Sequence, residues 1–189
     1  GGAITGLGVP PTSVDGVLGI SKAYTTRVGA GPLPSEIGGP LEESIREKGG
    51  EYGANTGRPR RCGWFDAVVA RYAARVNGFD SIALTKLDVL DHLAEIRVCT
   101  AYRFEGRQIE ELPADPEVFE RCEPVYESFP GWAAPTTGVR DYQMLPEGAR
   151  RYVERLTEAI GCEIGLISTG PDRLDTIFRG NSRLAGWFE

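Results

Sequence analysis

The segment Thr85–Asp88 (Thr-Lys-Leu-Asp) directly follows Ile82–Leu84, a short apolar run typical of a buried strand. A carboxylate such as that of Asp88 can accept hydrogen bonds from two neighbouring guanine donors, N1–H and N2–H2. Adenine lacks this donor pair and would leave the carboxylate unpaired. The stem of Lys86 can lie over the base and add apolar and cationic contact. The alternative interpretation is a solvated turn after a strand.

A second polar segment, Ser168–Pro171 (Ser-Thr-Gly-Pro), follows the apolar run Ile164–Ile167. Such a loop can offer backbone N–H groups or hydroxyls to a carbonyl such as guanine O6. Ligands of α/β proteins gather beyond the carboxyl ends of strands, so two loops of this kind can contribute to one site. Taken alone, the segment is also ordinary turn chemistry. The two loops together favour guanine recognition.

A third segment, Gly53–Arg61, contains Arg58, Arg60 and Arg61 in a loop-like stretch without a hydrophobic period. Arginine captures carboxylates and phosphates with two parallel hydrogen bonds, so the segment indicates a site for a dicarboxylate, a phosphate or both. The alternative is a solvated basic loop paired with surplus acids. Nucleic-acid binding is disfavoured by the net charge of −6 and by the lack of nearby interleaved aromatic residues.

Several catalytic motifs are absent from the sequence. It contains no G-x-x-x-x-G-K-[ST] phosphate loop, no H-E-x-x-H, no G-x-S-x-G and no C-x-x-C. The single histidine, His92, is interpreted either as a base or as a structural residue. The four cysteines are widely spaced, which predicts free thiols rather than a zinc site. We therefore assign no catalytic residue and no metal ligand to this chain, and we expect the phosphates of a bound guanine nucleotide to be held by residues outside it.

Helices interleaved with short apolar strands must position these segments. The sequence predicts a short helix near Thr12 and longer helices over Pro40–Lys48, Asp66–Val76 and Leu145–Ile160. In the helix predicted over Asp66–Val76 and the residue before it, the residues that share one apolar face are Phe65, Val68, Val69, Tyr72, Ala73 and Val76. Predicted strands cover Tyr24–Val28, Ile82–Leu84, Ile96–Phe104, Gln108–Ile109, Glu123–Glu127 and Ile164–Ile167.

The chain has 189 residues, of which 41% are hydrophobic, enough for about one domain with a substantial core. We draw no internal boundary within residues 1–189. No apolar run is long enough to cross a membrane and no signal peptide is visible. The predicted class is α/β, with part of a mixed or parallel sheet flanked by helices.

Taken together, seven segments resemble the adenylosuccinate synthetase family in order and spacing, and they extend over almost the whole chain. These segments are Val28–Glu36, Glu51–Gly53, Thr56–Trp64, Thr85–Asp91, Pro124–Glu127, Pro130–Trp132 and Ile167–Arg173. The Arg58–Arg61 loop and the Thr-Lys-Leu-Asp-Val-Leu-Asp run carry most of the specificity. The resemblance is to roughly the C-terminal half of the family's proteins, and it implies the C-terminal portion of a fold like that of the phosphate-loop nucleoside triphosphatases (P-loop NTPases). The family's N-terminal half, with its phosphate loop and its catalytic Asp and His, is missing here.

The resemblance implies a reaction in which GTP phosphorylates the 6-oxygen of IMP and L-aspartate then displaces the phosphate, with Mg²⁺ held by the missing half. It implies an aspartate loop made of Ala54, Asn55, Thr56, Gly57, Arg58, Pro59 and Arg60. Arg58 and Val28 would face IMP, and Arg60 would reach both aspartate and GTP. The residues implied for GTP binding are Arg60, Lys86, Leu87, Asp88, Ser168, Thr169 and Gly170.

The sequence departs from the family pattern at Asn55, where many relatives carry threonine, and at Leu33 and Ser35, where Phe and Thr are more usual. A related synthetase that acts on a guanine-type monophosphate is an alternative. Further alternatives are a stand-alone guanine-nucleotide or anion-binding module and a folded fragment that binds nothing. We expect the chain alone to be inactive and to need the N-terminal half or a second polypeptide. The family also implies a homodimer. The expected free thiols and the lack of a visible signal peptide favour a cytoplasmic location, and the net charge and the short apolar runs predict no nucleic-acid or membrane partner.

Overall fold

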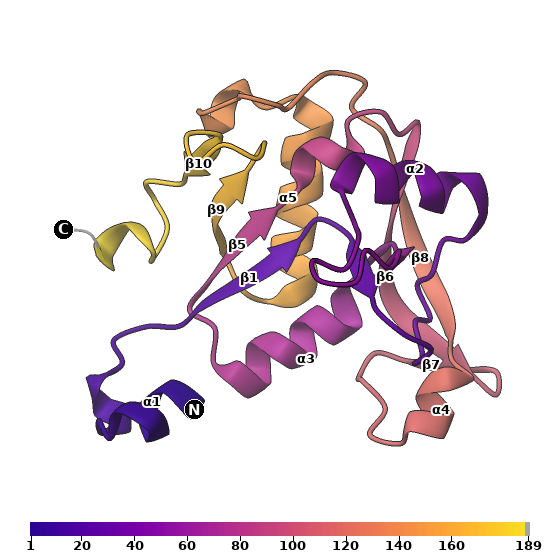
Figure 1. Cartoon of the computed structure of the whole chain (residues 1–189), viewed down its shortest axis with the longest axis horizontal. Helices are drawn as coiled ribbons and strands as arrows, with labels where there is room; N and C mark the ends of the chain where they lie inside the picture. Colours follow the sequence, from indigo (N-terminus) through magenta and orange to yellow (C-terminus); the bar gives the residue numbers. More distant parts are fainter. Residues whose placement is uncertain (188–189) are drawn as a thin grey trace.

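The computed structural model describes residues 1–187. Its central sheet has four strands in the order β1-β5-β9-β10, where β1, β5 and β9 are parallel and β10 is antiparallel to β9 (Figure 1). The bounds of these strands are β1 Leu18–Lys22, β5 Ser81–Thr85, β9 Ile164–Ser168 and β10 Thr176–Phe178. The strands predicted from the apolar runs Ile82–Leu84 and Ile164–Ile167 correspond to β5 and β9, so both predictions are confirmed.

Helical crossovers connect the parallel strands, as parallel pairing requires. Helix α3 (Ala67–Asn77) precedes β5, and helix α5 (Glu147–Ile160) precedes β9. In the view of Figure 1, α5 lies behind the central strands. Tyr152, Val153 and Leu156 of α5 are fully or almost fully buried in the main core, and the Tyr152 hydroxyl donates a 2.7 Å hydrogen bond to the carbonyl of Ala23. The predicted mixed sheet flanked by helices is therefore confirmed.

A second sheet lies to the side of the first. Its long strand β6 (Glu95–Phe104) pairs antiparallel with β7 (Arg107–Ile109) and β8 (Glu123–Pro130) and parallel with the short β4 (Phe65–Asp66). A further antiparallel pair is formed by β2 (Thr25–Arg27) and β3 (Arg61–Gly63). The remaining elements are α1 (Gly2–Leu7), η1 (Pro11–Ser13), α2 (Gly39–Gly49), η2 (Leu87–Leu90), α4 (Pro116–Glu120), η3 (Tyr142–Met144) and η4 (Ala185–Trp187). None of the helices within residues 1–187 is long and apolar enough to span a membrane.

Several boundaries differ from prediction. Helix α5 begins at Glu147 because Pro146 occupies its N-cap, and the strand expected from Tyr24 covers only β2. The helix expected near Thr12 is one 3₁₀ turn, and the stretch expected to be a loop up to Gly63 ends in β3. Strands β1, β4 and β10 were not predicted. The four cysteines are free thiols, as expected.

The predicted helix from Asp66 is confirmed, with Asp66 as its N-cap rather than its first residue. Its apolar face, however, is only partly buried. Val68 is 1% exposed, whereas Val69, Tyr72 and Val76 are 37%, 40% and 62% exposed. A helix normally buries such a stripe, so α3 leaves part of its apolar face without a packing partner among residues 1–187.

Candidate ligand-binding site

The loops after β5 and β9 meet at one edge of the central sheet. Because β5 and β9 are adjacent and parallel, their carboxyl ends lie side by side. Between them lies a cavity of about 170 Å³. The residues that line it are Lys48, Thr85, Lys86, Asp88, Val89, Ser168, Gly170 and Pro171. The structure thus brings together the two polar segments that the sequence singled out separately.

Lys86 begins the first of these loops in a left-handed conformation, with a φ of 64°. Non-glycine residues rarely adopt this region, and strain of this kind concentrates at functional sites. The Lys86 ammonium donates a 2.7 Å hydrogen bond to the carbonyl of Gly49, at the carboxyl end of α2. The next residue, Leu87, is fully buried, so only its backbone can face a ligand.

Asp88 lines the cavity with a half-buried carboxylate. No other residue among 1–187 donates a hydrogen bond to this side chain. Burial raises the pKa of Asp88 above its ordinary value, and the nearby carboxylates of Asp91 and Asp175 add to the shift. A carboxylate that is partly desolvated and short of donors is suited to accept hydrogen bonds from a ligand.

At the end of β9, the side chain of Thr169 faces inward, whereas Ser168, Gly170 and Pro171 line the cavity. The Thr169 side chain is fully buried, and its hydroxyl donates a 2.9 Å hydrogen bond to the carbonyl of Val139. The hydroxyl of Ser168 donates at 2.9 Å to the carbonyl of Gly170. A Cβ at Gly170 would lie 2.5 Å from the carboxylate of Asp175, so the loop has no space for a side chain there. Ser168 and Gly170 are therefore better placed than Thr169 to contact a ligand.

The arginine segment forms an exposed loop that is closed at its base. An antiparallel bridge joins Tyr52 to Pro59, and the amides of Gly53 and Gly57 donate 2.8 Å hydrogen bonds to the carbonyls of Arg58 and Gly53. Gly57 has a φ of 62°, which permits this tight turn. The residues from 54 to 59 are exposed, and the Arg58 guanidinium has no hydrogen bond or ion pair with the described part of the chain. Arg58 is therefore free to bind an anion.

The neighbouring arginines are paired with acids. Arg60 donates to the Glu51 carboxylate at 2.7 Å, and Arg61 forms a two-pronged pair with Glu36, with both distances 2.6 Å. Arg61 also donates to the carbonyl of Gly31 at 2.7 Å, in the turn that follows the exposed Val28. The alternative of a basic loop paired with surplus acids thus describes Arg60 and Arg61, but not Arg58.

Glu51 was not singled out as a functional residue from the sequence. It is 1% exposed, and its carboxylate accepts hydrogen bonds from Lys22, Tyr24 and Arg60. Burial would raise the pKa of Glu51, but these hydrogen bonds, led by that of Lys22, hold it below its ordinary value. Two of its partners, Lys22 and Tyr24, lie 29 and 27 positions away in the sequence, so no local pattern indicated this role.

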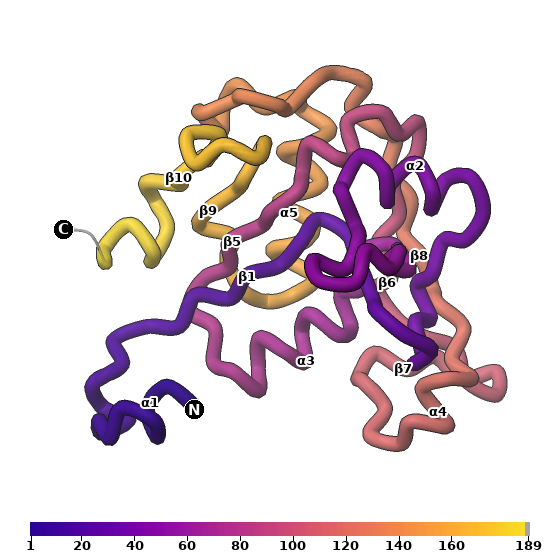
Figure 2. The backbone as a smooth tube through the Cα atoms, in the orientation of Figure 1, coloured from indigo at the N-terminus to yellow at the C-terminus, as the bar shows by residue number. Residues whose placement is uncertain are grey.

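The carboxyl end of α2 supports both candidate binding segments. Gly49 accepts the hydrogen bond from Lys86 of the cavity, and Glu51, two residues later, holds Arg60 of the exposed loop. Figure 2 shows the loop that follows α2 lying beside the end of β1, where Lys22 reaches Glu51. The two segments therefore share one rigid support.

His92 lies outside this arrangement. It is exposed, and its Nε2 lies 2.9 Å from the Ser44 hydroxyl on α2. Partial burial lowers the pKa of His92, and nearby Lys48 lowers it further. This geometry favours the structural interpretation over that of a base. Within residues 1–187, no group of three or more His, Cys, Asp or Glu side chains is placed to hold a metal ion.

A parallel sheet with polar loops converging beyond its carboxyl ends defines an α/β protein that binds small ligands at that edge. The family model described as adenylosuccinate synthetase matches residues 1–177. The chain belongs to the adenylosuccinate synthetase family.

Individual relatives agree with this family. The adenylosuccinate synthetase of Trichlorobacter lovleyi is 59% identical over 181 residues, covering 96% of this chain and 42% of the relative. That of Geobacter metallireducens is 56% identical, covering 94% and 41%. The structure of fully ligated adenylosuccinate synthetase from Plasmodium falciparum is 39% identical with a TM-score of 0.90, covering 94% of this chain and 43% of that one. The chain thus spans less than half the length of these relatives.

Proposed function

We propose that this chain is the portion of an adenylosuccinate synthetase that binds the guanine base of GTP and the carboxylates of L-aspartate. The parent protein joins L-aspartate to IMP at the expense of GTP and produces adenylosuccinate. The observation that carries this proposal is the convergence of Asp88, Ser168 and Gly170 on one cavity. The end of α2 that contacts Lys86 of this cavity also leads into the loop with Arg58, which has no partner among the described residues. Family membership supports the reaction class.

Each group has a role suited to its chemistry. The Asp88 carboxylate accepts hydrogen bonds from the two guanine donors, N1–H and N2–H2. The backbone N–H groups or the hydroxyls of residues 168–170 donate hydrogen bonds to guanine O6. Arg58 binds aspartate and, with Val28, faces IMP. Arg60, held by Glu51, reaches both aspartate and GTP. The other members of the aspartate loop are Ala54, Asn55, Thr56, Gly57 and Pro59. In this role the chain positions charges around a phosphoryl transfer.

The remainder of the family's length would complete the reaction. Mg²⁺ neutralises phosphate charge in such transfers, and we assign its ligands to that remainder. We also propose a homodimer in the cytoplasm for the parent protein, from the same resemblance. We assign no catalytic residue to this chain, so it is expected to be inactive alone.

Guanine recognition is tested by titration calorimetry of the purified chain with GDP, IDP and ADP. IDP lacks the 2-amino group, so it loses one of the two donors to Asp88. We expect the order GDP, then IDP, then ADP, and we expect Asp88→Asn to weaken GDP binding at least tenfold, because a hydrogen bond to a charged group contributes about 1.5–3 kcal/mol. The matched control is Asp15→Asn, an exposed carboxylate in the N-terminal segment.

The outcomes separate the alternatives. A guanine preference without any gain of activity on adding the rest of a family chain would favour a stand-alone binding module. No nucleotide-dependent heat or stabilisation would indicate a folded fragment that binds nothing. Activity is also compared with IMP and with GMP after the rest of a family chain has been added. Activity with IMP alone would indicate the IMP-specific enzyme, and activity with GMP would indicate a synthetase for a guanine-type monophosphate. Adenylosuccinate made by the chain alone, in proportion to its concentration, would contradict the expected inactivity.

A further inference from the structure

The cavity between the loops after β5 and β9 has few hydrogen-bond donors left for a ligand. The Lys86 ammonium at 2.7 Å, the Thr85 hydroxyl at 3.2 Å and the Ser168 hydroxyl at 2.9 Å each donate to a backbone carbonyl of the chain. The amide of Thr169 likewise donates to the carbonyl of Asp175 at 2.9 Å. These groups already have acceptors within the protein, so the acceptor atoms of a bound base need a donor from elsewhere.

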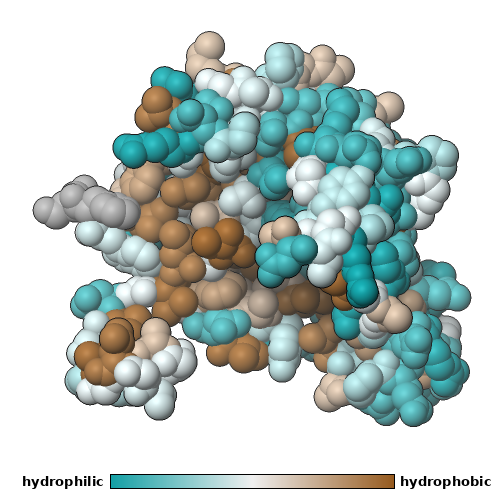
Figure 3. Space-filling model, viewed as in Figure 1, coloured by the Kyte–Doolittle hydropathy of each residue, from teal (hydrophilic) through white to brown (hydrophobic). Residues whose placement is uncertain are grey.

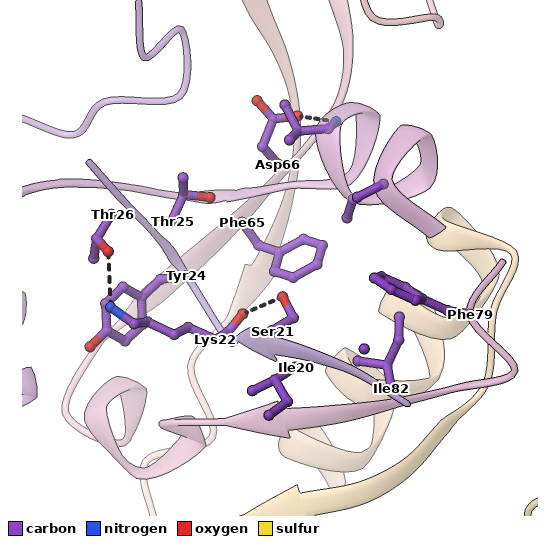
Figure 4. A pocket seen from close by; sticks show the side chains of 14 residues that line it. Ile20, Ser21, Lys22, Tyr24, Thr25, Thr26, Phe65, Asp66, Phe79 and Ile82 are labelled. Carbon is purple, nitrogen blue, oxygen red and sulfur yellow. Dashed lines mark hydrogen bonds between the residues drawn. The ribbon is translucent and has the colours of Figure 1, made fainter. Parts of the chain in front are cut away.

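Lys48, in the last turn of α2, is a donor of the required kind. It lines the same cavity, and its ammonium has no hydrogen bond or ion pair with any residue among 1–187. Lys22, at the carboxyl end of β1, is a second cation at this edge of the sheet. Its ammonium, however, donates at 2.9 Å to Thr26, as Figure 4 shows, and at 2.7 Å to Glu51. Lys48 is therefore the cation that remains available to a ligand in the cavity.

A cation at this position also has an ordinary structural explanation. Arg46 and Lys48 are the basic residues in the last turn of α2, where positive charge stabilises the helix dipole. Figure 3, in the orientation of Figure 1, shows a largely hydrophilic surface over α2, as expected of a solvated helix. Arg46 is held by an ion pair with Glu42 at 2.6 Å and by the carbonyl of Arg60 at 2.7 Å, whereas Lys48 has no such partner. The helix dipole thus explains the charge of Lys48 but not its place in the cavity wall.

One acceptor and one free donor in the same cavity select among purine bases. When guanine donates from N1–H and N2–H2 to Asp88, its O6 and N7 are left as acceptors, and a lysine ammonium pairs well with these two atoms. Adenine carries an amino group at position 6, which would place a donor against the ammonium of Lys48. The cavity holds about 170 Å³, less than the roughly 300–1,000 Å³ of sites that enclose a whole drug-sized ligand, so its size suits a base.

We propose that Lys48 donates hydrogen bonds to O6 and N7 of the guanine base and, beside Asp88, determines the specificity for guanine. The inference rests on the proposed function, because it adds a contact to the same base. Asp88 contacts the donor atoms of the base and Lys48 the acceptor atoms. O6 has two lone pairs, so it can accept from Lys48 and from the loop after β9 together.

Titration calorimetry of the chain with GDP and 7-deaza-GDP tests this contact. In 7-deaza-GDP a C–H group replaces N7, while the phosphates, the ribose and the two donors to Asp88 are unchanged. We expect wild type to bind 7-deaza-GDP about tenfold more weakly than GDP, because one hydrogen bond from a charged donor is lost. Lys48→Met removes the ammonium and keeps an unbranched apolar side chain. It should weaken GDP binding about tenfold and bind the two ligands within about twofold of each other.

Two further variants separate this contact from a general effect of charge. Lys48→Arg keeps the charge and the donors, so it should retain the preference for GDP over 7-deaza-GDP. Arg151→Met is the matched control, because Arg151 is an exposed cation on α5 that does not line the cavity, and it should leave the preference at the wild-type value.

A second measurement uses this chain combined with the rest of a family chain. The ratio of kcat/KM for GTP to kcat/KM for 7-deaza-GTP should be about ten in wild type and below about two in Lys48→Met. The KM for aspartate should change less than about threefold, because Lys48 contacts only the base.

Each outcome supports or overturns the contact. If Lys48 faced the phosphates or only stabilised α2, Lys48→Met would affect both ligands equally, and an unchanged ratio would overturn the proposal. Equal binding of GDP and 7-deaza-GDP by wild type would also overturn it. A wild type that prefers GDP to ADP but shows either of these results would contradict the role of Lys48 and leave the proposed function standing. A wild type that binds no guanine nucleotide would contradict the proposed function itself.

Discussion

Arg60 donates a 2.7 Å hydrogen bond to the carboxylate of Glu51, which is 1% exposed and also holds Lys22. Two cations and one tyrosine hydroxyl thus converge on a single buried charge. The pairing fixes the guanidinium of Arg60 at the base of the exposed loop while leaving Arg58 free. A loop that must grip an anion gains from such an anchor, because less side-chain freedom is lost on binding.

We expect Glu51→Gln to lower the free energy of unfolding at pH 7 by about 2–3 kcal/mol, because the neutral amide leaves two partly buried cations without their counter-charge. The folded state holds the pKa of Glu51 below its ordinary value. The stability that the ionised Glu51 carboxylate contributes to the folded state is therefore complete above about pH 4.3, the pKa of glutamate in the unfolded chain. It is lost as the pH falls through the lower pKa of Glu51 in the folded state.

Urea denaturation between pH 3 and 7 measures this effect. The difference between wild type and Glu51→Gln should be largest near neutrality and shrink in acid. Glu43→Gln, on the exposed side of α2, is the control and should show no such trend. A constant difference across this range would contradict the assigned ion pairing.

Asp91 ties the loop that carries Asp88 to the segment after β8. Its carboxylate accepts hydrogen bonds from the indole N–H of Trp132 at 2.7 Å and from the amide and hydroxyl of Thr136 at 2.7 and 2.8 Å. Thr136 is fully buried, so an amide group at position 91 would leave a donor facing a donor.

We expect Asp91→Asn to cost about 2–4 kcal/mol in unfolding free energy, since at least one buried hydrogen bond to a charge is lost. Urea denaturation followed by tryptophan fluorescence measures this cost. Asp115→Asn, which alters an exposed N-cap of the short α4, should cost about 1 kcal/mol or less. Equal costs for the two variants would refute the role assigned to Asp91.

The parts of the fold that follow from local patterns were predicted correctly. Strands β5 and β9 are short apolar runs, and α5 has a clear apolar stripe ended by Gly161. Because these strands are neighbours, the two polar loops after them meet at one cavity, which made that site predictable. Which side chains of each loop line the cavity was not predictable, since only the structure shows that the side chains of Leu87 and Thr169 are buried.

Other features depend on partners distant in the sequence. Strand β1 contains Gly19 and Lys22 and shows no clear strand pattern, yet it pairs in full register with β5. Glu51 contacts residues 27 and 29 positions away. The apolar face of α3 was correctly recognised, but its exposure could not be, because burial depends on what packs against a helix as well as on its own pattern.

A second buried carboxylate, Asp66, should show the opposite pH dependence from Glu51. It caps α3 by accepting hydrogen bonds at 3.1 Å from the amides of Val68 and Val69, and it accepts another at 2.6 Å from the Tyr102 hydroxyl. Burial raises its pKa despite these bonds, because no cation is paired with it. Folding therefore favours its protonated form.

As the pH rises from about 4, the unfolded value, through the raised folded pKa, wild type should lose stability relative to Asp66→Asn, which does not titrate. At pH 7 we expect the two proteins to differ by about 1 kcal/mol or less, because asparagine is an equally good N-cap. Melting temperatures at half-unit steps between pH 4 and 7 measure the difference. A wild type that gains stability relative to Asp66→Asn over this interval would show that the carboxyl is paired more favourably than its surroundings indicate.

Arg58 and Arg61, three positions apart, should give opposite results in the same pair of assays. Arg61 forms its two-pronged pair with Glu36 and donates to the backbone of the turn after β2, so Arg61→Lys loses a planar match that lysine cannot reproduce. Both members of that pair are about one-third exposed, which limits the cost in unfolding free energy to about 0.5–1 kcal/mol. Arg58 contacts no acid in the described chain, so Arg58→Lys should leave the unfolding free energy within about 0.5 kcal/mol of wild type.

The kinetic assay uses this chain combined with the rest of a family chain. If Arg58 binds the carboxylates of aspartate, Arg58→Lys should raise the concentration of aspartate needed for half-maximal rate at least tenfold, while Arg61→Lys should change it less than threefold. Reversed assignments in the two assays would mean that the free guanidinium of Arg58 is not the anion-binding group.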